Sequence, residues 1–278
     1  MRDRCIMRNM YKLIAKICLI AILLFSAGCK NNTAQGDGTV LNLATYNVGV
    51  FDKSGFDTTE MISDMMKELG VQVLSMNELD SCNTRHPSFQ LEDFAGKMGN
   101  WGFIFGPAIN YKGGKYGVGV AYSPALEPIR KYSMTLEQGD GAEQRALAVC
   151  EFKDFVFAST HLDHRSAAAQ LTQAEILTGW ASVNYGKGNK PIILCGDFNA
   201  LPDSETISLM RKNWTILSPL DFTFSAKKPS KCIDYIMVYK NAYKRVKVLE
   251  SKVCKQFNSG DVAVASDHLP VYVRIEIK

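Results

Sequence analysis

The chain has 278 residues, of which 46% are hydrophobic and 22% are charged, with 21 Gly and 9 Pro. This composition excludes low-complexity, fibrous and disordered proteins, so we expect a globular fold. The formal charge of +4 suggests a nucleic-acid partner only if the basic residues lie in the folded part of the chain.

The basic excess is concentrated at the N-terminus. Residues 1–28 contain five Lys or Arg against the single acid Asp3, and they include the apolar run Ile17–Phe25 and the small residues that precede Cys29. A basic segment, a short apolar run and small residues before a cysteine are typical of a bacterial lipoprotein signal peptide. We therefore expect cleavage before Cys29, lipidation of Cys29, and an exported protein that is lipid-anchored to the bacterial cell envelope in an extracytoplasmic location.

The alternative is a permanent N-terminal membrane helix. An apolar stretch from Leu13 to Phe25 is shorter than the ~20 residues that usually span a bilayer, which favours cleavage. Ser26 departs from the lipoprotein pattern, which prefers Leu at this position. Cleavage removes 5 of the 32 Lys and Arg and 1 of the 28 Asp and Glu, which leaves 27 of each. The mature chain is then formally neutral, so its net charge no longer favours nucleic acid.

An odd number of cysteines, five, remains beyond Cys29. They form no Cys-x-x-Cys pair and no Cys/His zinc spacing, so neither a zinc site nor a disulfide framework is indicated, although one disulfide stays open. These cysteines are Cys82, Cys150, Cys195, Cys232 and Cys254.

Residues 29–39 are polar and contain Gly, so we predict a flexible tether. No second linker or repeat interrupts residues 40–278, which we predict to be one domain. Seven strand-like runs end in polar residues and three helical stretches interleave with them, so we predict a layered α/β sandwich with more strands than helices. The strand-like runs are Val40–Asn47, Val71–Glu78, Gly117–Tyr122, Phe155–His161, Pro191–Asp197, Cys232–Val238 and Pro270–Ile277. The helical stretches are Thr58–Leu69, Ser88–Met98 and Ser166–Val183.

Polar side chains stand at the ends of several predicted strands, where a rigid sheet can gather them at one site. Asn47 ends the first run and Glu78 ends the second. Asp197 and Asn199 are two residues apart in Gly-Asp-Phe-Asn, so their side chains point the same way in an extended chain. Taken singly, each of these residues could belong to a turn or a solvated loop. Their combination indicates a ligand site.

Three of the four histidines lie in polar clusters. His161 and His164 belong to Thr-His-Leu-Asp-His, and His268 follows Asp267 in Ser-Asp-His-Leu-Pro. A histidine beside a carboxylate suits metal binding, proton transfer or phosphate contact, although a structural role stays open for each. The fourth histidine, His86, is interpreted as a solvated loop residue.

Six clusters, in this order, resemble the endonuclease/exonuclease/phosphatase superfamily. The resemblance covers nearly all of residues 40–278 and implies a four-layer α-β-β-α sandwich of two packed mixed sheets flanked by helices, with the site at one edge of the sheets. Asn77 departs from the family, which often has Gln before the acid, and this departure leaves the metal ligands intact. The clusters are Thr-Tyr-Asn47-Val, Asn-Glu78, Thr-His161-Leu, Gly-Asp197-Phe-Asn199, Ile-Asp234-Tyr-Ile and Ser-Asp267-His268-Leu-Pro.

The resemblance implies a phosphoesterase that uses Mg²⁺ or Mn²⁺. On this basis we assign Glu78 as the principal metal ligand, with Asn47 and Asp267 as further oxygen ligands. Hard divalent cations prefer carboxylate and amide oxygens, so these residue types fit the metal independently of the resemblance.

Five further residues are assigned to catalysis on the same basis. His268 is a general base or a stabiliser of the attacked phosphoryl group, and Asp234 orients its ring. Asp197 activates or orients the attacking water, Asn199 positions the water or the phosphate, and His161 donates to a non-bridging oxygen. The choice of Asp197 or His268 as the base stays open. Secondary candidates for hydrogen bonding or phosphate contact are Arg145, Asp163 and His164.

A non-specific nuclease gains affinity from an extended basic surface, and the mature chain is formally neutral. We therefore expect a phosphodiesterase that acts on small or lipid-linked phosphodiesters. An extracytoplasmic endo- or exonuclease is the second expectation, and sugar or inositol phosphates are the third substrate class. The segment Asn110–Tyr116 suits base stacking with phosphate contact, or is an ordinary hairpin turn. The alternative of a different class is a non-catalytic phosphate-binding lipoprotein. We expect a monomer that meets the membrane through its lipid anchor.

Overall fold

The computed structural model describes residues 38–278, which form one compact unit. The predicted signal peptide, the lipidation of Cys29 and the tether up to residue 37 lie outside the described residues. Thr39, which we predicted as the last residue of the tether, is instead the first residue of a strand. Within residues 38–278, no helix combines the length and apolar character needed to cross a bilayer.

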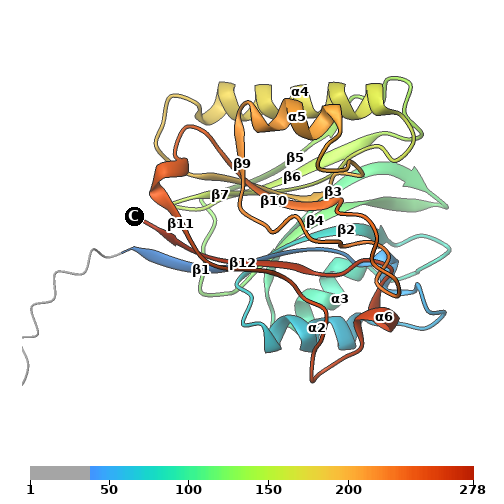
Figure 1. The fold of residues 1–278 in the computed structure, drawn as a ribbon. Helices are drawn as coiled ribbons and strands as arrows, with labels where there is room; N and C mark the ends of the chain where they lie inside the picture. Colours follow the sequence, from blue (N-terminus) through green and yellow to red (C-terminus); the bar gives the residue numbers. More distant parts are fainter. Residues whose placement is uncertain (1–37) are drawn as a thin grey trace, which may run out of the picture. The chain divides into compact units, whose positions relative to one another are not determined.

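Two six-stranded sheets make up the centre of this unit (Figure 1). The first sheet consists of β1 (Thr39–Asn47), β2 (Val73–Ser81), β3 (Gly102–Tyr111), β4 (Gly114–Tyr122), β11 (Val246–Val253) and β12 (Val271–Ile277). The second consists of β5 (Arg130–Leu136), β6 (Arg145–Glu151), β7 (Val156–His161), β8 (Ile192–Asp197), β9 (Trp214–Ile216) and β10 (Asp234–Tyr239). The strand orders are β11-β12-β1-β2-β4-β3 and β5-β6-β7-β8-β10-β9. Both sheets are mixed, because β1 runs parallel to β2 and β7 to β8 while the other neighbours are antiparallel.

Helices cover the outer face of each sheet (Figure 1). The helices α2 (Thr59–Glu68) and α3 (Gln90–Lys97) lie on the first sheet, and α4 (Ala167–Tyr185) and α5 (Glu205–Arg211) lie on the second. The result is the four-layer α-β-β-α sandwich that the resemblance implied, so this prediction is confirmed. Three short elements complete the unit: α6 (Val262–Ala265) and the 3₁₀ turns η1 (Gly49–Phe51) and η2 (Tyr243–Arg245).

Apolar side chains fill the space between the sheets and the space under α4 and α5. All six residues of β8 are buried, which explains why interior strands have continuous apolar runs in the sequence. Polar links between the two sheets occur beside the predicted site. Ser75 Oγ donates to Ser159 Oγ at 2.8 Å, and Asn77 Nδ2 donates to the Thr160 carbonyl at 2.7 Å. These hydrogen bonds fix the two sheets against each other at this end.

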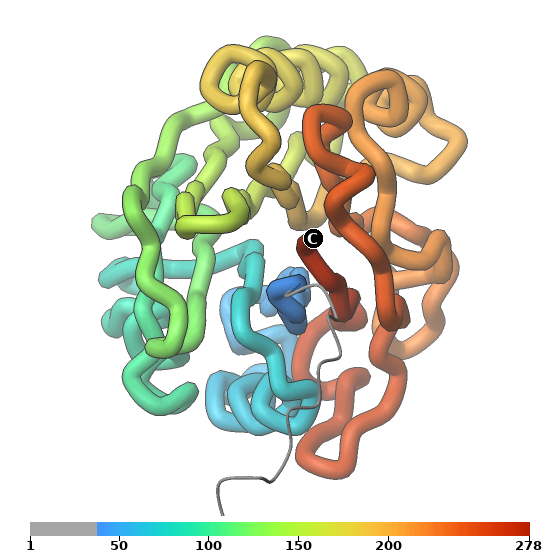
Figure 2. Tube along the Cα trace, turned by 90° about the vertical axis from the view of Figure 1, so that its left-hand side faces the viewer, coloured from blue at the N-terminus to red at the C-terminus, as the bar shows by residue number. Residues whose placement is uncertain are grey.

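The first and last strands are neighbours in the first sheet. β1 pairs with β12 from Thr39 opposite Ile277 to Thr45 opposite Val271, and Figure 2 shows the two strands side by side. Both are interior strands, since β11 and β2 flank them. The C-terminal end of β1 therefore lies beside the segment that leads into β12.

All seven predicted strands and all three predicted helices are present, with ends within three residues of the predicted ones. The sequence did not predict β3, β5, β6, β9, β11, α5 or α6. Four of the five missed strands, β3, β5, β9 and β11, are sheet edges. An edge strand carries exposed polar side chains, which weakens its apolar pattern. The five cysteines within residues 38–278 are all free thiols.

Candidate active site

Strand ends bring the predicted residues to one edge of the sandwich. The parallel strands β1 and β2 carry Asn47 and Glu78 to this edge. The parallel strands β7 and β8 carry His161 and Asp197, which are directly paired. Because β10 runs antiparallel to β8, its first residue Asp234 lies opposite Asp197. The topology therefore gathers residues that are far apart in the sequence.

A cavity of about 540 Å³ opens at this edge. Eight of the predicted site residues line it, while Asn47, Asp163 and Asp234 are buried and do not line it. The eight lining residues are Glu78, Arg145, His161, His164, Asp197, Asn199, Asp267 and His268.

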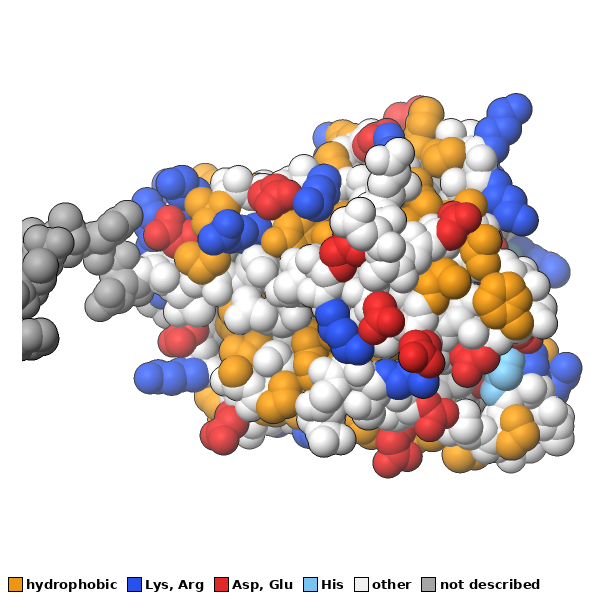
Figure 3. Space-filling model, turned by 90° about the horizontal axis from the view of Figure 1, so that it is seen from below, with side chains coloured by type: hydrophobic (Ala, Val, Ile, Leu, Met, Phe, Trp, Pro, Cys, Tyr) orange, Lys and Arg blue, Asp and Glu red, His pale blue; other side chains and the backbone are white. Residues whose placement is uncertain are grey.

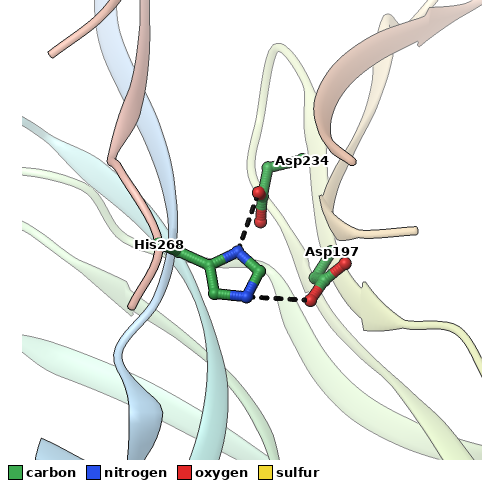
Figure 4. Close-up of side chains that lie close together, drawn as sticks. All are labelled: Asp197, Asp234 and His268. Carbon is green, nitrogen blue, oxygen red and sulfur yellow. Dashed lines mark hydrogen bonds and ion pairs between the residues drawn. The ribbon is translucent and has the colours of Figure 1, made fainter. Parts of the chain in front are cut away.

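The centre of the cavity is a buried Asp–His–Asp arrangement (Figure 4). His268 Nδ1 lies 2.9 Å from Asp234 Oδ2, and His268 Nε2 lies 3.6 Å from Asp197 Oδ2. Phe224 packs against the imidazole, with the ring centroids 4.9 Å apart. The ring of His268 is thus held by Asp234 at one nitrogen and by the packing of Phe224, and its other nitrogen faces Asp197.

The electrostatics of this arrangement favour a protonated His268. Burial opposes the charge of the ring, but the carboxylates of Asp234 and Asp197 outweigh it and raise the pKa of His268. Burial and the neighbouring charge of Asp234 raise the pKa of Asp197. His161 behaves differently, because burial and the nearby charge of Arg145 lower its pKa well below the usual range. At pH 7, therefore, the ring of His268 is charged and that of His161 is neutral.

A tight turn after β8 places Asn199 beside His161. The Asn199 backbone N–H donates to Asp197 Oδ1 at 2.8 Å, and its Nδ2 lies 3.0 Å from His161 Nε2. Asn199 has φ 49°, and Gly196 in the preceding strand has φ 146°. A Cβ at Gly196 would lie 1.8 Å from the Thr160 carbonyl oxygen, so only glycine allows this close approach of β8 to β7.

A bulge in β2 turns Glu78 into the site. The register between β2 and β4 shifts between Met76 and Leu79, and Glu78 has φ 58°. Such a bulge changes the direction of a side chain and leaves one residue of the strand without its regular pairing in the sheet. Asn47 Nδ2 donates to Glu78 Oε1 and to Asp197 Oδ2, both at 3.1 Å. The Asn47 Oδ1 atom accepts the Gly49 N–H at 3.1 Å, so in this arrangement Asn47 positions the two carboxylates through its amide nitrogen.

Lys53, a residue that the sequence reasoning missed, lies between the two predicted carboxylate ligands of the metal. Its Nζ is 3.3 Å from Glu78 Oε2 and 3.3 Å from Asp267 Oδ2. Burial opposes the charge of Lys53, but Glu78 and Asp267 outweigh it and raise its pKa. The position therefore attracts a cation, and its oxygen donors fit Mg²⁺ or Mn²⁺. Together with the buried Asp197–Asp234–His268 group, these residues could hold a divalent metal.

The opposite side of the cavity carries a buried guanidinium. Arg145 is only 2% exposed, and it contacts Glu143 Oε1 at 2.9 Å and His164 Nδ1 at 3.0 Å. Its Nε has no hydrogen-bond partner among residues 38–278. Arg145 and His164 thus remain candidates for anion contact, as predicted.

Asp163, the third secondary candidate, forms hydrogen bonds, which is one of the two roles predicted for it, and it does not line the cavity. Its Oδ2 accepts the Ala142 N–H at 2.7 Å, and its Oδ1 accepts the N–H groups of Arg165 and Ser166 at 2.8 Å each. With its oxygens turned to backbone donors, Asp163 fixes the loop before α4 and does not reach the cavity. The polar motif around His161 gave no signal to separate this residue from its neighbours.

The segment Asn110–Tyr116 is a hairpin between β3 and β4, with its turn at residues 112–113. Tyr116 lines the cavity, and the guanidinium of Arg85 lies over the rings of Tyr111 and Tyr116, 4.7 and 5.9 Å from their centroids. The hairpin alternative is thus the observed one, with an aromatic side chain at the cavity. The other lining residues that sequence reasoning did not assign to the site are Glu143, Leu201, Phe224, Lys231 and Ile233.

Comparisons with known proteins agree with the family resemblance and with the fold described above. The model of the Endonuclease/Exonuclease/phosphatase family matches residues 44–268. An endonuclease/exonuclease/phosphatase of Bacteroides vulgatus is similar in structure, with a TM-score of 0.71, 18% identity, and coverage of 86% of this chain and 100% of that chain. A mannosyl-6-phosphatase of Bacteroides thetaiotaomicron is similar with a TM-score of 0.68 and 20% identity, covering 84% of this chain and 99% of that chain. The 2′,3′-cyclic phosphatase ANGEL2 is similar with a TM-score of 0.67 and 15% identity, covering 86% of this chain and 96% of that chain. A search of curated protein sequences finds no match.

Proposed function

Since the chain belongs to the endonuclease/exonuclease/phosphatase family, we propose that it is a divalent-metal-dependent hydrolase of small or lipid-linked phosphodiesters. Members of this family hydrolyse phosphoesters and generally depend on a divalent metal, so the chain is a phosphoester hydrolase. The observation that carries the finer proposal is that one cavity is lined both by Asp197 and His268, whose ring contacts the buried Asp234, and by the carboxylates of Glu78 and Asp267.

Glu78 and Asp267 would hold Mg²⁺ or Mn²⁺, and the amide of Asn47, which donates to Glu78, would keep that ligand in place. When bound, such a metal neutralises negative charge that develops on the phosphoryl and leaving-group oxygens. Asn47 would couple this side of the site to the other, because the same amide nitrogen donates to Glu78 and Asp197.

We assign Asp197 as the general base. Its raised pKa brings it towards neutral pH, where a carboxylate accepts a proton from water most effectively. His268 already carries its proton, so it is better suited to stabilise charge on the attacked phosphoryl group than to remove a proton. Asp234 keeps that proton on the ring and fixes its orientation.

Asn199 and His161 complete the side from which water attacks. The Asn199 side chain bridges His161 Nε2 and the Leu162 carbonyl, which holds its amide at the cavity wall. His161 is neutral, so it can donate a hydrogen bond from its other ring nitrogen to a non-bridging phosphate oxygen. These roles describe an in-line attack by water on a phosphoryl group.

The size of the cavity favours a small substrate. A volume of about 540 Å³ accommodates a headgroup-sized ligand. Tight nucleic-acid binding draws on many lysines and arginines along a surface. On the face that bears α2 and α3, basic and acidic side chains are interspersed (Figure 3). We rank a nuclease second because the predicted mature chain is formally neutral.

Phosphomonoesters of sugars or inositol form a further candidate class, which one observation favours. A phosphomonoester carries more negative charge than a diester, and the guanidinium of Arg145, which lines the cavity, would contact such a charge. The mannosyl-6-phosphatase of Bacteroides thetaiotaomicron shares this fold at 20% identity.

The proposed location is extracytoplasmic, with a monomer anchored by a lipid on Cys29. The support for this is the basic and apolar composition of residues 1–28 and the cysteine that follows them. A lipid anchor would keep the enzyme at a membrane surface, where lipid-linked phosphodiesters are concentrated. Labelling of cells with a fatty-acid analogue, comparing the wild type with Cys29→Ser, tests the anchor; equal labelling of both would reject it.

A substrate panel tests the activity. Purified protein lacking residues 1–29 is incubated with a chromogenic phosphodiester, sphingomyelin, phosphatidylinositol, a hexose 6-phosphate, RNA and plasmid DNA, each with Mg²⁺, Mn²⁺ or EDTA. We expect metal-dependent hydrolysis, fastest on a small or lipid diester. Faster plasmid nicking at physiological salt would favour the nuclease, and turnover of the hexose phosphate alone would favour the monoesterase. Phosphate binding without any turnover would indicate a non-catalytic lipoprotein.

A further inference from the structure

Lys53 lies between the two carboxylates that we propose as metal ligands. The single Nζ atom is equidistant, at 3.3 Å, from an oxygen of Glu78 and an oxygen of Asp267. These are the two carboxylates that line the cavity on the metal side. The lysine side chain is about one third exposed, so it can leave this position without disturbing the core.

The local backbone is built to let Lys53 reach the carboxylates. Gly49 has φ 54°, and a Cβ at this position would lie 2.3 Å from Cγ and 2.4 Å from Cε of Lys53. The aliphatic stem of Lys53 therefore lies flat across a residue without a side chain. The loop itself is anchored to the segment before Asp267, because Ser54 Oγ donates to the Val264 carbonyl at 2.7 Å. The lysine is thus aimed at the carboxylates by its loop.

Charge balance gives this contact a consequence for metal binding. Glu78 and Asp267 together carry two negative charges near the further carboxylates Asp197 and Asp234. One ammonium group neutralises part of this charge in the metal-free protein. A divalent cation held by the same two oxygens would share them with the ammonium, and two cations that share ligands repel each other. The ammonium and the metal therefore exclude each other.

We propose that Lys53 is an internal competitor of the divalent metal: its ammonium group holds Glu78 and Asp267 in the metal-free protein and must leave when the metal binds. This inference rests on the proposed function, because it takes Glu78 and Asp267 as metal ligands. Lys53 then lowers the affinity for the metal and prevents mutual repulsion of the carboxylates while the metal is absent. A simple surface ion pair would have neither effect.

The test is a direct measurement of Mn²⁺ binding. Lys53→Met keeps the length of the stem and removes the charge, and Lys53→Arg keeps the charge. The matched control is Lys227→Met, which removes a lysine that lines a neighbouring surface cavity together with Lys53 and Asp267. The Kd for Mn²⁺ is measured by calorimetry, and the Tm is measured with and without Mn²⁺.

We expect Lys53→Met to bind Mn²⁺ at least tenfold more tightly than the wild type and to show a larger rise of Tm on Mn²⁺ addition. Lys53→Arg and Lys227→Met should stay within about twofold of the wild type. Equal or weaker Mn²⁺ binding by a folded Lys53→Met overturns the competition while leaving the metal site in place. Absence of Mn²⁺ binding in every variant overturns both this inference and the proposed metal dependence, so the two failures are distinguishable.

Discussion

The two sides of the cavity are built in different ways. On one side, His268 and Asp234 are almost fully buried, and hydrogen bonds within the protein hold the ring of His268 in place. On the other side, Glu78 and Asp267 are 20% and 35% exposed, and they share one flexible lysine. A group that transfers or stabilises a proton gains from a rigid dry environment. A site that admits a hydrated ion gains from exposure and from side chains that can move, because the ion brings its own water.

The largest effect is expected from a substitution on the rigid side of the cavity, at His268. His268→Ala should lower kcat by about 10³-fold, since the charged ring that faces the phosphoryl group is lost. Raising the metal concentration should not restore the rate. The measurement is steady-state hydrolysis of the chromogenic diester over a range of Mg²⁺ concentrations, with Tm as a check of folding. His86→Ala, which changes a histidine outside the cavity lining, is the matched control. Unchanged turnover in His268→Ala would reject the role of this residue.

A substitution on the exposed side should lower the affinity for the metal more than the rate at saturating metal. Glu78→Gln keeps the shape of the side chain and removes its charge, so the affinity for the metal should fall by about 10- to 100-fold. The rate should be low at limiting Mg²⁺ and should recover partly when Mg²⁺ is raised. The exposed Glu92→Gln serves as the control for loss of a negative charge. A loss of rate that is independent of the metal concentration would contradict the ligand role of Glu78.

The smallest expected effect concerns Asp163, which fixes the loop before α4, and it appears in stability. Asp163→Asn should lower the free energy of unfolding by about 1–3 kcal/mol at pH 7, because charge-assisted hydrogen bonds to three backbone N–H groups are weakened. These hydrogen bonds hold the pKa of Asp163 below its usual value, although burial opposes them. The stabilisation is therefore complete above the unfolded pKa of ~3.9 and is lost as the pH falls through the lower folded value.

Urea unfolding of the wild type and Asp163→Asn between pH 3 and pH 7 measures this difference. The gap between the two proteins should narrow towards the acid end. A gap that stays constant with pH would show that the ionised form of Asp163 does not stabilise the fold.

The sequence was sufficient to predict the site residues that end long buried strands. Asn47 and Asp197 follow apolar runs whose direction is set by the parallel pairs, so their convergence could be predicted. Lys53 could not be predicted, because it belongs to no motif and its contacts depend on the path of a loop across Gly49. For Asp163 the choice between hydrogen bonding and phosphate contact could not be made from the sequence, because a polar motif does not show which of its members faces a cavity and which faces the backbone.

The fold shows the same division. The interior strands other than β6 were predicted from their long apolar runs. In contrast, β5 has only one buried residue, and most positions of β11 are exposed. Each of these strands is held in its sheet by pairing with a neighbouring strand. A short stretch of sequence does not contain this information.

The pairing of β1 with β12 has a consequence for the order in which the molecule can assemble. Ser266 Oγ donates to the Asn47 carbonyl at 2.7 Å across 219 positions of the chain. During synthesis the N-terminal strand must wait for the last residues before it gains its second neighbour, and long-range pairing of this kind slows folding. A nascent chain that ends before Ser266 lacks Asp267 and His268 as well as the strand that closes the sheet. Hydrolytic competence therefore requires that the chain has been synthesised through β12.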